Sequence, residues 1–372
     1  MASSVADGSM KSTLMWFMAV MLVSGAANTL LMKFMVMQKV PTSPGASRQG
    51  FDHPFFQSLL MMIGEFLCLI VYYASGRSQG AKTEDAPKHI FAVACLFDWT
   101  ATTLVNMAYV CIAASVVQMT RGAIVIFTCI FSVIFLGRRQ HAHHLAGVGL
   151  VFLGITLVSL STFVNPAHST ATAPTSKVYV QLVGISLCIG AQVFQASMLV
   201  YEEKIMNQYT VPPLMVVGME GFFGILFGVV LLSVLNFTGV ESTPGAIFQM
   251  GHSTPLLLAV IASIFSIAFF NFSGVTVTQQ ASAVARSTID VSRTIIIWAV
   301  ELALGWNTFN SLQLAGFCVL ALGTMIYNRL IVIPFLDAPE KGETSPILRR
   351  RKLQEQKAIS SSFLQGSKPA EV

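Results

Sequence analysis

The chain has 372 residues, of which 54% are hydrophobic and only 10% are charged. A soluble globular domain carries roughly 25% charged residues, so this composition excludes an ordinary cytosolic enzyme. It also excludes disorder over most of the length, because the chain has too much apolar surface to remain unfolded in water. We therefore expect a membrane protein. The cysteines lie in apolar runs without metal-ligand spacing and are interpreted as core residues: Cys68, Cys95, Cys111, Cys129, Cys188 and Cys318.

Ten apolar runs are each long enough to cross a bilayer as a helix, which takes about 20 residues. Helix breakers or charges stand at several boundaries, as at His53-Pro54, Arg138-Arg139 and Pro212-Pro213. The first run is too long for a cleavable signal peptide and is expected to act as a signal anchor. The sequence therefore predicts an all-α integral membrane protein with ten transmembrane helices at approximately 12–37, 54–75, 88–110, 114–136, 142–163, 178–201, 212–236, 254–277, 280–304 and 309–330.

The distribution of basic residues predicts the orientation in the membrane. Lys and Arg are concentrated at the two ends and in the even-numbered connections, while the odd-numbered connections carry only Lys39, Arg48 and Lys177. Because basic residues are enriched on the cytosolic side, both termini are predicted to be cytosolic. We divide the chain into a short cytosolic N-terminus (1–11), five spans (12–163), a non-cytosolic loop (164–177), five more spans (178–330) and a disordered cytosolic tail (331–372).

The two groups of five spans carry a repeated pattern. Leu145-Ala146-Gly147 and Leu153-Gly154 in the fifth span recur in the tenth as Leu314-Ala315-Gly316 and Leu322-Gly323. Because each group has an odd number of spans, the second group must enter the membrane with the opposite topology. The sequence therefore predicts two inverted five-helix repeats. This arrangement is typical of secondary transporters, whose solute site lies near the bilayer midplane between the repeats.

Charged residues inside the spans indicate where a site lies, since each is costly in lipid unless it faces a partner or water. Arg286, Asp290 and Arg293 stand at i, i+4 and i+7 of the ninth span and share one helix face. One aspartate leaves part of the charge of two arginines uncompensated, which predicts a positively charged lining. The fourth span carries a similar polar stripe, which we expect to face the ninth span across the repeat axis: Gln118, Arg121, Val125, Thr128 and Ser132.

Acidic and amide residues of other spans complete the candidate site. Glu65, Asp98 and Glu220 are expected to pair with the arginines or to bind a coupling proton, and Asn271 is expected to bond a neighbouring helix or to line the site. The alternative is a buried salt-bridge network that only holds helices together.

Other charges are given ordinary structural roles. Lys33 and Glu301 lie near span ends, where their side chains can reach the interface. Glu202-Glu203-Lys204 follows the sixth span and is interpreted as a solvated helix end.

No catalytic or cofactor motif accompanies these charges. The sequence has no phosphate-binding loop of the Walker type, so direct ATP drive is not expected. It has no Ser/His/Asp or HExxH arrangement, and the cluster of His141, His143 and His144 lacks a partner acid for a metal. We predict no enzymatic activity, no cofactor and no metal site.

Several segments resemble the drug/metabolite transporter superfamily, and most closely subfamily F of solute carrier family 35. The resemblance covers nearly all ten spans and implies a ten-helix inverted-repeat fold, a solute-carrier role and residence in lysosomal, vacuolar or other internal membranes. It does not imply a particular solute. Its main segments are Phe51 to Gln57 with Gly64-Glu65-Phe66, Gln118 to Ala123, Phe131 to Arg139, Glu202-Glu203-Lys204, Gly218 to Gly221, Ser266 to Phe272, Arg293-Thr294 and Leu302 to Trp306.

The functional hypothesis is a secondary transporter that moves a small polar or anionic organic solute by alternating access. Its partners are that solute and the lipid bilayer; nothing indicates nucleic acid, and a homodimer stays open. In the tail, Glu343 with Ile347-Leu348 resembles an acidic dileucine sorting signal, which would bind sorting adaptors. The alternatives are a non-transporting membrane scaffold that acts through its cytosolic tail and, third, an integral-membrane enzyme.

Overall fold

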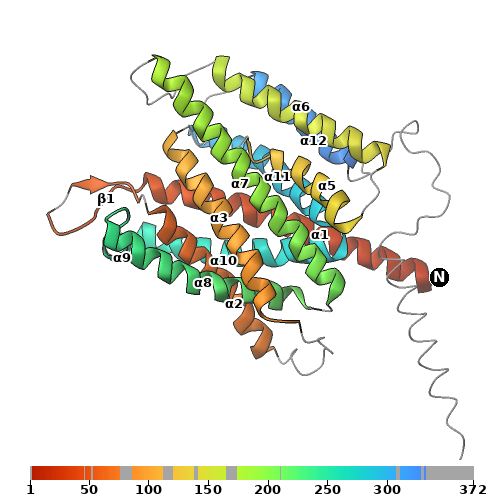
Figure 1. Ribbon diagram of the computed structural model, residues 1–372, viewed down its shortest axis with the longest axis horizontal. Coiled ribbons are helices and arrows are strands. Elements are labelled where there is room, and N and C mark those ends of the chain that lie inside the picture. Colours follow the sequence, from red (N-terminus) through yellow and green to blue (C-terminus); the bar gives the residue numbers. More distant parts are fainter. Residues whose placement is uncertain are drawn as a thin grey trace, which may run out of the picture. The chain divides into compact units, whose positions relative to one another are not determined.

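The computed structural model describes residues 2–45, 47–51, 53–75, 86–111, 120–137, 141–164, 174–209, 211–306, 311–327 and 331. These residues are almost entirely helical, and each of the ten predicted spans overlaps a helix (Figure 1). In chain order these helices are α1 (Ala2–Met37), α2 (Pro54–Ala74), α3 (His89–Cys111), α5 (Ala123–Leu136), α6 (Ala142–Val164), α7 (Pro174–Gln208), α8 (Pro213–Thr238), α10 (Thr254–Gln280), α11 (Ala283–Ala303) and α12 (Ser311–Tyr327).

Length and polarity divide these helices into three kinds. Five are long and apolar enough to cross a membrane, namely α1, α2, α7, α8 and α10. The helices α3, α5, α6 and α12 contain apolar segments of 10–17 residues. Helix α11 has 21 residues but carries four charged side chains, so it needs polar neighbours inside the membrane. These helices confirm the prediction of an all-α, multi-pass membrane protein.

The helix ends follow from local sequence. Pro54 and Pro213 are the first residues of α2 and α8, where the N–H that proline lacks would have no helical partner. The hydroxyl of Ser282 accepts a hydrogen bond from the Ala285 N–H at 3.0 Å and caps the start of α11. Gly239 ends α8 with a φ of 74°, a left-handed conformation that favours glycine.

Each helix of the first group packs against a helix of the second. The most extensive pairs are α6 with α12, α2 with α8, α3 with α7 and α1 with α10, and α5 also contacts α11. In chain order, α1, α2, α3, α5 and α6 of the first group correspond to α7, α8, α10, α11 and α12 of the second. If every helix is exchanged for its counterpart, α3 with α7 becomes α10 with α1 and the reverse, and the other three pairs stay the same. The set of pairs is therefore unchanged.

The repeated glycine segments form the contact between α6 and α12, which lie side by side in Figure 1. A Cβ added at Gly147 would lie 2.9 Å from the carbonyl oxygen of Gly323, and one at Gly154 would lie 2.8 Å from that of Gly316. Two backbones approach this closely only where side chains are absent. The first glycine of each segment meets the second glycine of the other, so the two helices run antiparallel.

Two small elements were not predicted. A short helix, α9 (Thr243–Gly251), follows α8, and Val40–Pro41 (β1) pairs with Arg48–Gln49 (β2) as an antiparallel hairpin. The Gln249 amide of α9 donates to the Val40 carbonyl at 2.9 Å. The Glu241 carboxylate, just before α9, accepts from the Phe55 and Phe56 N–H groups in the first turn of α2 at 3.1 and 2.8 Å. These contacts hold one end of the helix bundle together.

Candidate functional site

A chain of polar contacts connects four helices in the interior. The Asn271 amide of α10 donates to Glu65 Oε1 of α2 at 2.5 Å. Asn271 Oδ1 accepts from the Arg286 Nη2 of α11 at 3.5 Å, and Arg286 Nη1 forms an ion pair with Glu202 of α7. Glu65, Arg286 and Glu202 are 6%, 4% and 0% exposed. Water is therefore excluded from these charges, which makes their interactions strong.

Two more carboxyl groups interact with this series of polar contacts. Asp98 of α3 and Glu220 of α8 both interact electrostatically with Arg286. Glu220 is 4% exposed, and its Oε1 has no hydrogen-bond partner among the described residues. An unbonded carboxylate oxygen in the interior is costly unless the site serves a ligand or a proton. We call the group of Glu65, Asp98, Glu202, Glu220, Asn271 and Arg286 the central cluster.

Close packing of α2 against α8 brings Glu65 and Glu220 together. A Cβ added at Gly221 would lie 2.4 Å from the Phe66 nitrogen and 2.8 Å from the Glu65 Cβ, and one at Gly218 would lie 2.5 Å from the Leu69 nitrogen. Glycine is required at both positions because the opposing atoms belong largely to a helix backbone. Since Gly221 directly follows Glu220, this contact fixes the Glu220 backbone beside the turn that carries Glu65.

The balance of charge in the central cluster differs from what the sequence led us to expect. Four carboxyl groups interact electrostatically with the guanidinium of Arg286, and Arg121, just before α5, interacts electrostatically with Asp98. When these groups are ionised, the cluster carries an excess of negative charge. The expectation of an uncompensated positive face on the ninth span does not hold for Arg286, because Glu202 from another helix pairs with it.

Glu202 is the residue that sequence reasoning missed. The sixth span was predicted to end at residue 201, with Glu202 and Glu203 as a solvated helix end. This prediction was wrong, because α7 continues to Gln208 and the two glutamates are 0% and 2% exposed. The signal in the sequence was the apolar pair Ile205-Met206 after the acids, which is typical of a helix that stays buried.

Arg293 and Asp290 form a second, separate group on α11. The Arg293 Nε lies 3.1 Å from Asp290 Oδ1, and the guanidinium stands over the Phe270 ring at 4.8 Å. Arg293 is two turns from Arg286, or about 10 Å along the helix. The structure thus gathers Glu65, Asp98, Glu220, Asn271 and Arg286 but holds Asp290 and Arg293 apart from them. The other predicted site residues, Gln118, Glu343, Ile347 and Leu348, lie outside the described residues.

One residue of the predicted polar stripe on α5 contacts α11. The Thr128 hydroxyl of α5 lies 2.8 Å from the Ser287 hydroxyl of α11, and both residues are fully buried. Ser287 directly follows Arg286, so this hydrogen bond connects α5 to the turn that supports the central cluster.

Two other predicted features lie elsewhere. The Lys33 ammonium of α1 forms an ion pair with Glu301 of α11 at 2.8 Å, instead of each side chain reaching the interface alone. The rings of His143 and His144 are in contact, with centroids 4.0 Å apart and planes tilted by 40°. Within the described ranges, no group of three or more His, Cys, Asp or Glu side chains is arranged to hold a metal ion.

The fold and the central cluster define a class of protein: a multi-pass membrane protein with charged groups buried among its helices. The sequence model of the CRT-like, chloroquine-resistance transporter-like family matches residues 14–247. The human protein named solute carrier family 35 member F6 is 37% identical over 332 residues, which cover 83% of this chain and 87% of that protein. The mouse protein of the same name is 37% identical over 328 residues with the same coverage.

A more distant relative and a solved structure also match this chain. An uncharacterized protein of Schizosaccharomyces pombe is 31% identical and covers 86% of this chain and 98% of its own length. A crystal structure with 14% identity matches with a TM-score of 0.59 over 86% of this chain and 97% of the solved chain, which shows likeness of fold alone. The chain belongs to the CRT-like, chloroquine-resistance transporter-like family, and it is a membrane transporter-type protein similar to solute carrier family 35 member F6.

Proposed function

We propose that this protein is a secondary transporter that moves a small, positively charged organic solute by alternating access, with the central cluster as the solute site. The observation that carries the proposal is the excess of buried carboxyl groups, with Glu220 Oε1 left without a hydrogen-bond partner among the described residues. A lining of one charge sign concentrates ligands of the opposite sign. The name of the human and mouse relatives, a solute carrier, supports a transport role.

The expectation of an anionic solute depended on three arginines without partners. Within the described residues, Arg286 contacts Glu202 and Arg293 contacts Asp290, and Arg121 interacts with Asp98. A cation would be attracted to the remaining carboxylates, whereas an anion would meet their repulsion. The cluster therefore favours a cationic solute, and protonation of Glu65 or Glu220 would be a means of releasing it.

We also propose that ten spans form two inverted five-helix repeats. The antiparallel contact between the glycine segments of α6 and α12 and the exchange symmetry of the helix pairs support this arrangement. Helices of both groups contribute to the central cluster, as expected for a site between two repeats that rock against each other. The distribution of Lys and Arg supports cytosolic termini, and the resemblance to subfamily F supports an internal membrane.

Transport by purified protein in proteoliposomes tests the proposal. Uptake of a panel of radiolabelled organic cations would be compared with that of neutral and anionic solutes of similar size. Glu65→Gln and Glu220→Gln remove a carboxylate from the cluster, while Glu301→Gln removes one from α11 outside it. We expect saturable cation uptake that the first two variants lose and the third retains. Uptake of anions alone, or equal uptake by all variants, would refute the site.

The scaffold alternative predicts a different result. Removal of residues 332–372 would abolish the function of a scaffold that acts through its tail. A transporter without the tail would retain uptake in proteoliposomes, because all residues of the central cluster lie before that point.

A further inference from the structure

Two consecutive glutamates near the end of α7 bind the first turn of α11 in different ways. Glu202 forms an ion pair with the Arg286 side chain, and Glu203 Oε2 accepts a hydrogen bond from the Ala283 N–H at 2.8 Å. Ala283 is the first residue of α11, and its N–H has no partner within its own helix. A side chain and a backbone group of the same helix turn are thus both held by α7.

Both contacts are shielded from water. Glu202 and Glu203 are 0% and 2% exposed, and Arg286 is 4% exposed. Breaking a buried ion pair strongly destabilises the arrangement that contains it, because it leaves an unpaired charge. A carboxylate at a helix start is also favoured by the partial positive charge of that end. The two contacts therefore join the α7 end to the α11 start, and removing one partner of either leaves a buried polar group without its bond.

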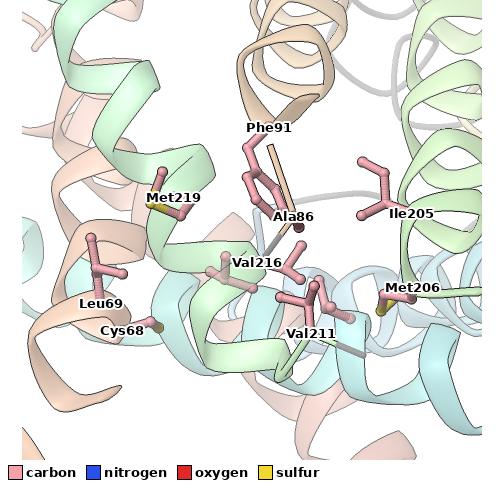
Figure 2. Packing of buried hydrophobic residues seen from close by; sticks show 11 residues of the cluster. Cys68, Leu69, Ala86, Phe91, Ile205, Met206, Val211, Val216 and Met219 are labelled. Atoms are coloured by element: carbon pink, nitrogen blue, oxygen red, sulfur yellow. The ribbon is translucent and has the colours of Figure 1, made fainter. Parts of the chain in front are cut away.

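Apolar side chains close the same end of the bundle. Figure 2 shows Ile205 and Met206 of α7 together with Phe91, Val216 and Met219 from α3 and α8. The Gln279 amide near the end of α10 donates to the Val211 carbonyl, in the connection from α7 to α8, at 3.1 Å. The end of α7, the start of α8 and the end of α10 thus pack together at the end of the bundle that carries Glu202 and Glu203.

We propose that Glu202 and Glu203 form a latch that keeps the predicted cytosolic gate closed, and that this gate opens when the α10–α11 turn leaves the end of α7. The inference rests on the proposed function, because a gate serves alternating access. Arg286 belongs both to the latch and to the central cluster through Asn271. A solute that draws Glu65 away from Asn271 would therefore alter the partners of Arg286 and weaken the latch.

Cysteine labelling tests the latch without any knowledge of the solute. Thr278 of α10 is 2% exposed and lies one turn beyond Gly274, whose Cα faces Arg286 closely enough that an added Cβ would lie 2.7 Å from Arg286 Nε. In a Thr278→Cys background, a membrane-impermeant maleimide would be added to the predicted cytosolic side, and labelling at residue 278 would be followed by mass spectrometry.

The latch would be broken by Glu202→Gln and, in a second variant, by Glu203→Met. A matched control is Glu241→Met, which removes another buried glutamate that binds a helix start, at the other end of the bundle. We expect each latch variant to raise the labelling rate at least about tenfold, and Glu241→Met to leave it unchanged. Monodisperse elution in size-exclusion chromatography would establish that each variant is folded.

Three outcomes would overturn the latch: labelling at the parent rate in both folded latch variants, equal acceleration by Glu241→Met, or labelling that is already fast in the Thr278→Cys parent. Each result is independent of solute uptake. Accelerated labelling together with absent cation uptake would keep the latch and refute the solute site, so the two proposals fail separately.

Discussion

The contact between α2 and α8 gives a sharp test of how Glu65 and Glu220 are positioned. Gly221→Ala would place a Cβ 2.4 Å from the Phe66 nitrogen, whereas ordinary contacts begin at 3.4 Å. The two helices must therefore separate locally by about 1 Å to restore normal contact. Overpacking of this kind costs about 1–3 kcal/mol, and we expect the upper part of that range because a helix backbone cannot rotate away.

The substitution also stabilises the helix itself, since alanine is favoured over glycine inside a helix by about 1 kcal/mol. The free energy of unfolding should therefore fall by about 2 kcal/mol, which corresponds to a decrease in Tm of about 3 °C for a chain of 372 residues. Thermal unfolding of the purified protein in detergent measures this change. Gly149→Ala in α6 is the matched control, because no atom lies within 4 Å of its added Cβ.

We expect Gly149→Ala to have an unchanged or higher Tm. If Gly221→Ala were also as stable as the parent protein, the close approach of α2 and α8 would be incorrect, and with it the placement of Glu220 beside Glu65.

Other contacts make graded predictions for the same unfolding assay. Arg286→Ala leaves Glu202 as an unpaired buried charge and should cost about 3–5 kcal/mol; a cost below about 1 kcal/mol would mean that water reaches the pair. Lys33→Gln breaks an ion pair whose lysine side chain is 35% exposed, and its cost should stay below about 1 kcal/mol. Thr128→Val removes the hydroxyl that contacts Ser287 and should cost about 1 kcal/mol; a stabilised variant would show that this contact contributes nothing.

The helices were predictable because the bilayer imposes a strong pattern on the sequence. Apolar runs bounded in several places by prolines or charges predicted the ten spans, and Pro54 stands where a span was predicted to begin. The helix α9 and the hairpin at Val40–Pro41 were missed because neither element is long enough to show a periodic pattern.

The candidate site was predictable in composition but not in pairing. Helical spacing placed Arg286 and Arg293 on one face, but spacing within one helix says nothing about which side chain of another helix faces each arginine. Glu202 was missed because a polar pair after an apolar run normally marks the end of a span. The partners of Arg286 follow from tertiary packing, which brings α7 and α10 against α11.

The central claim is that the buried carboxylates bind a cationic solute, and initial uptake rates in proteoliposomes test it most directly. For the best cation of the panel, Glu220→Gln should lower the uptake rate at least about tenfold, while Glu301→Gln should stay within about twofold of the parent protein. Uptake by Glu220→Gln at the parent rate, with the protein folded, would contradict the account.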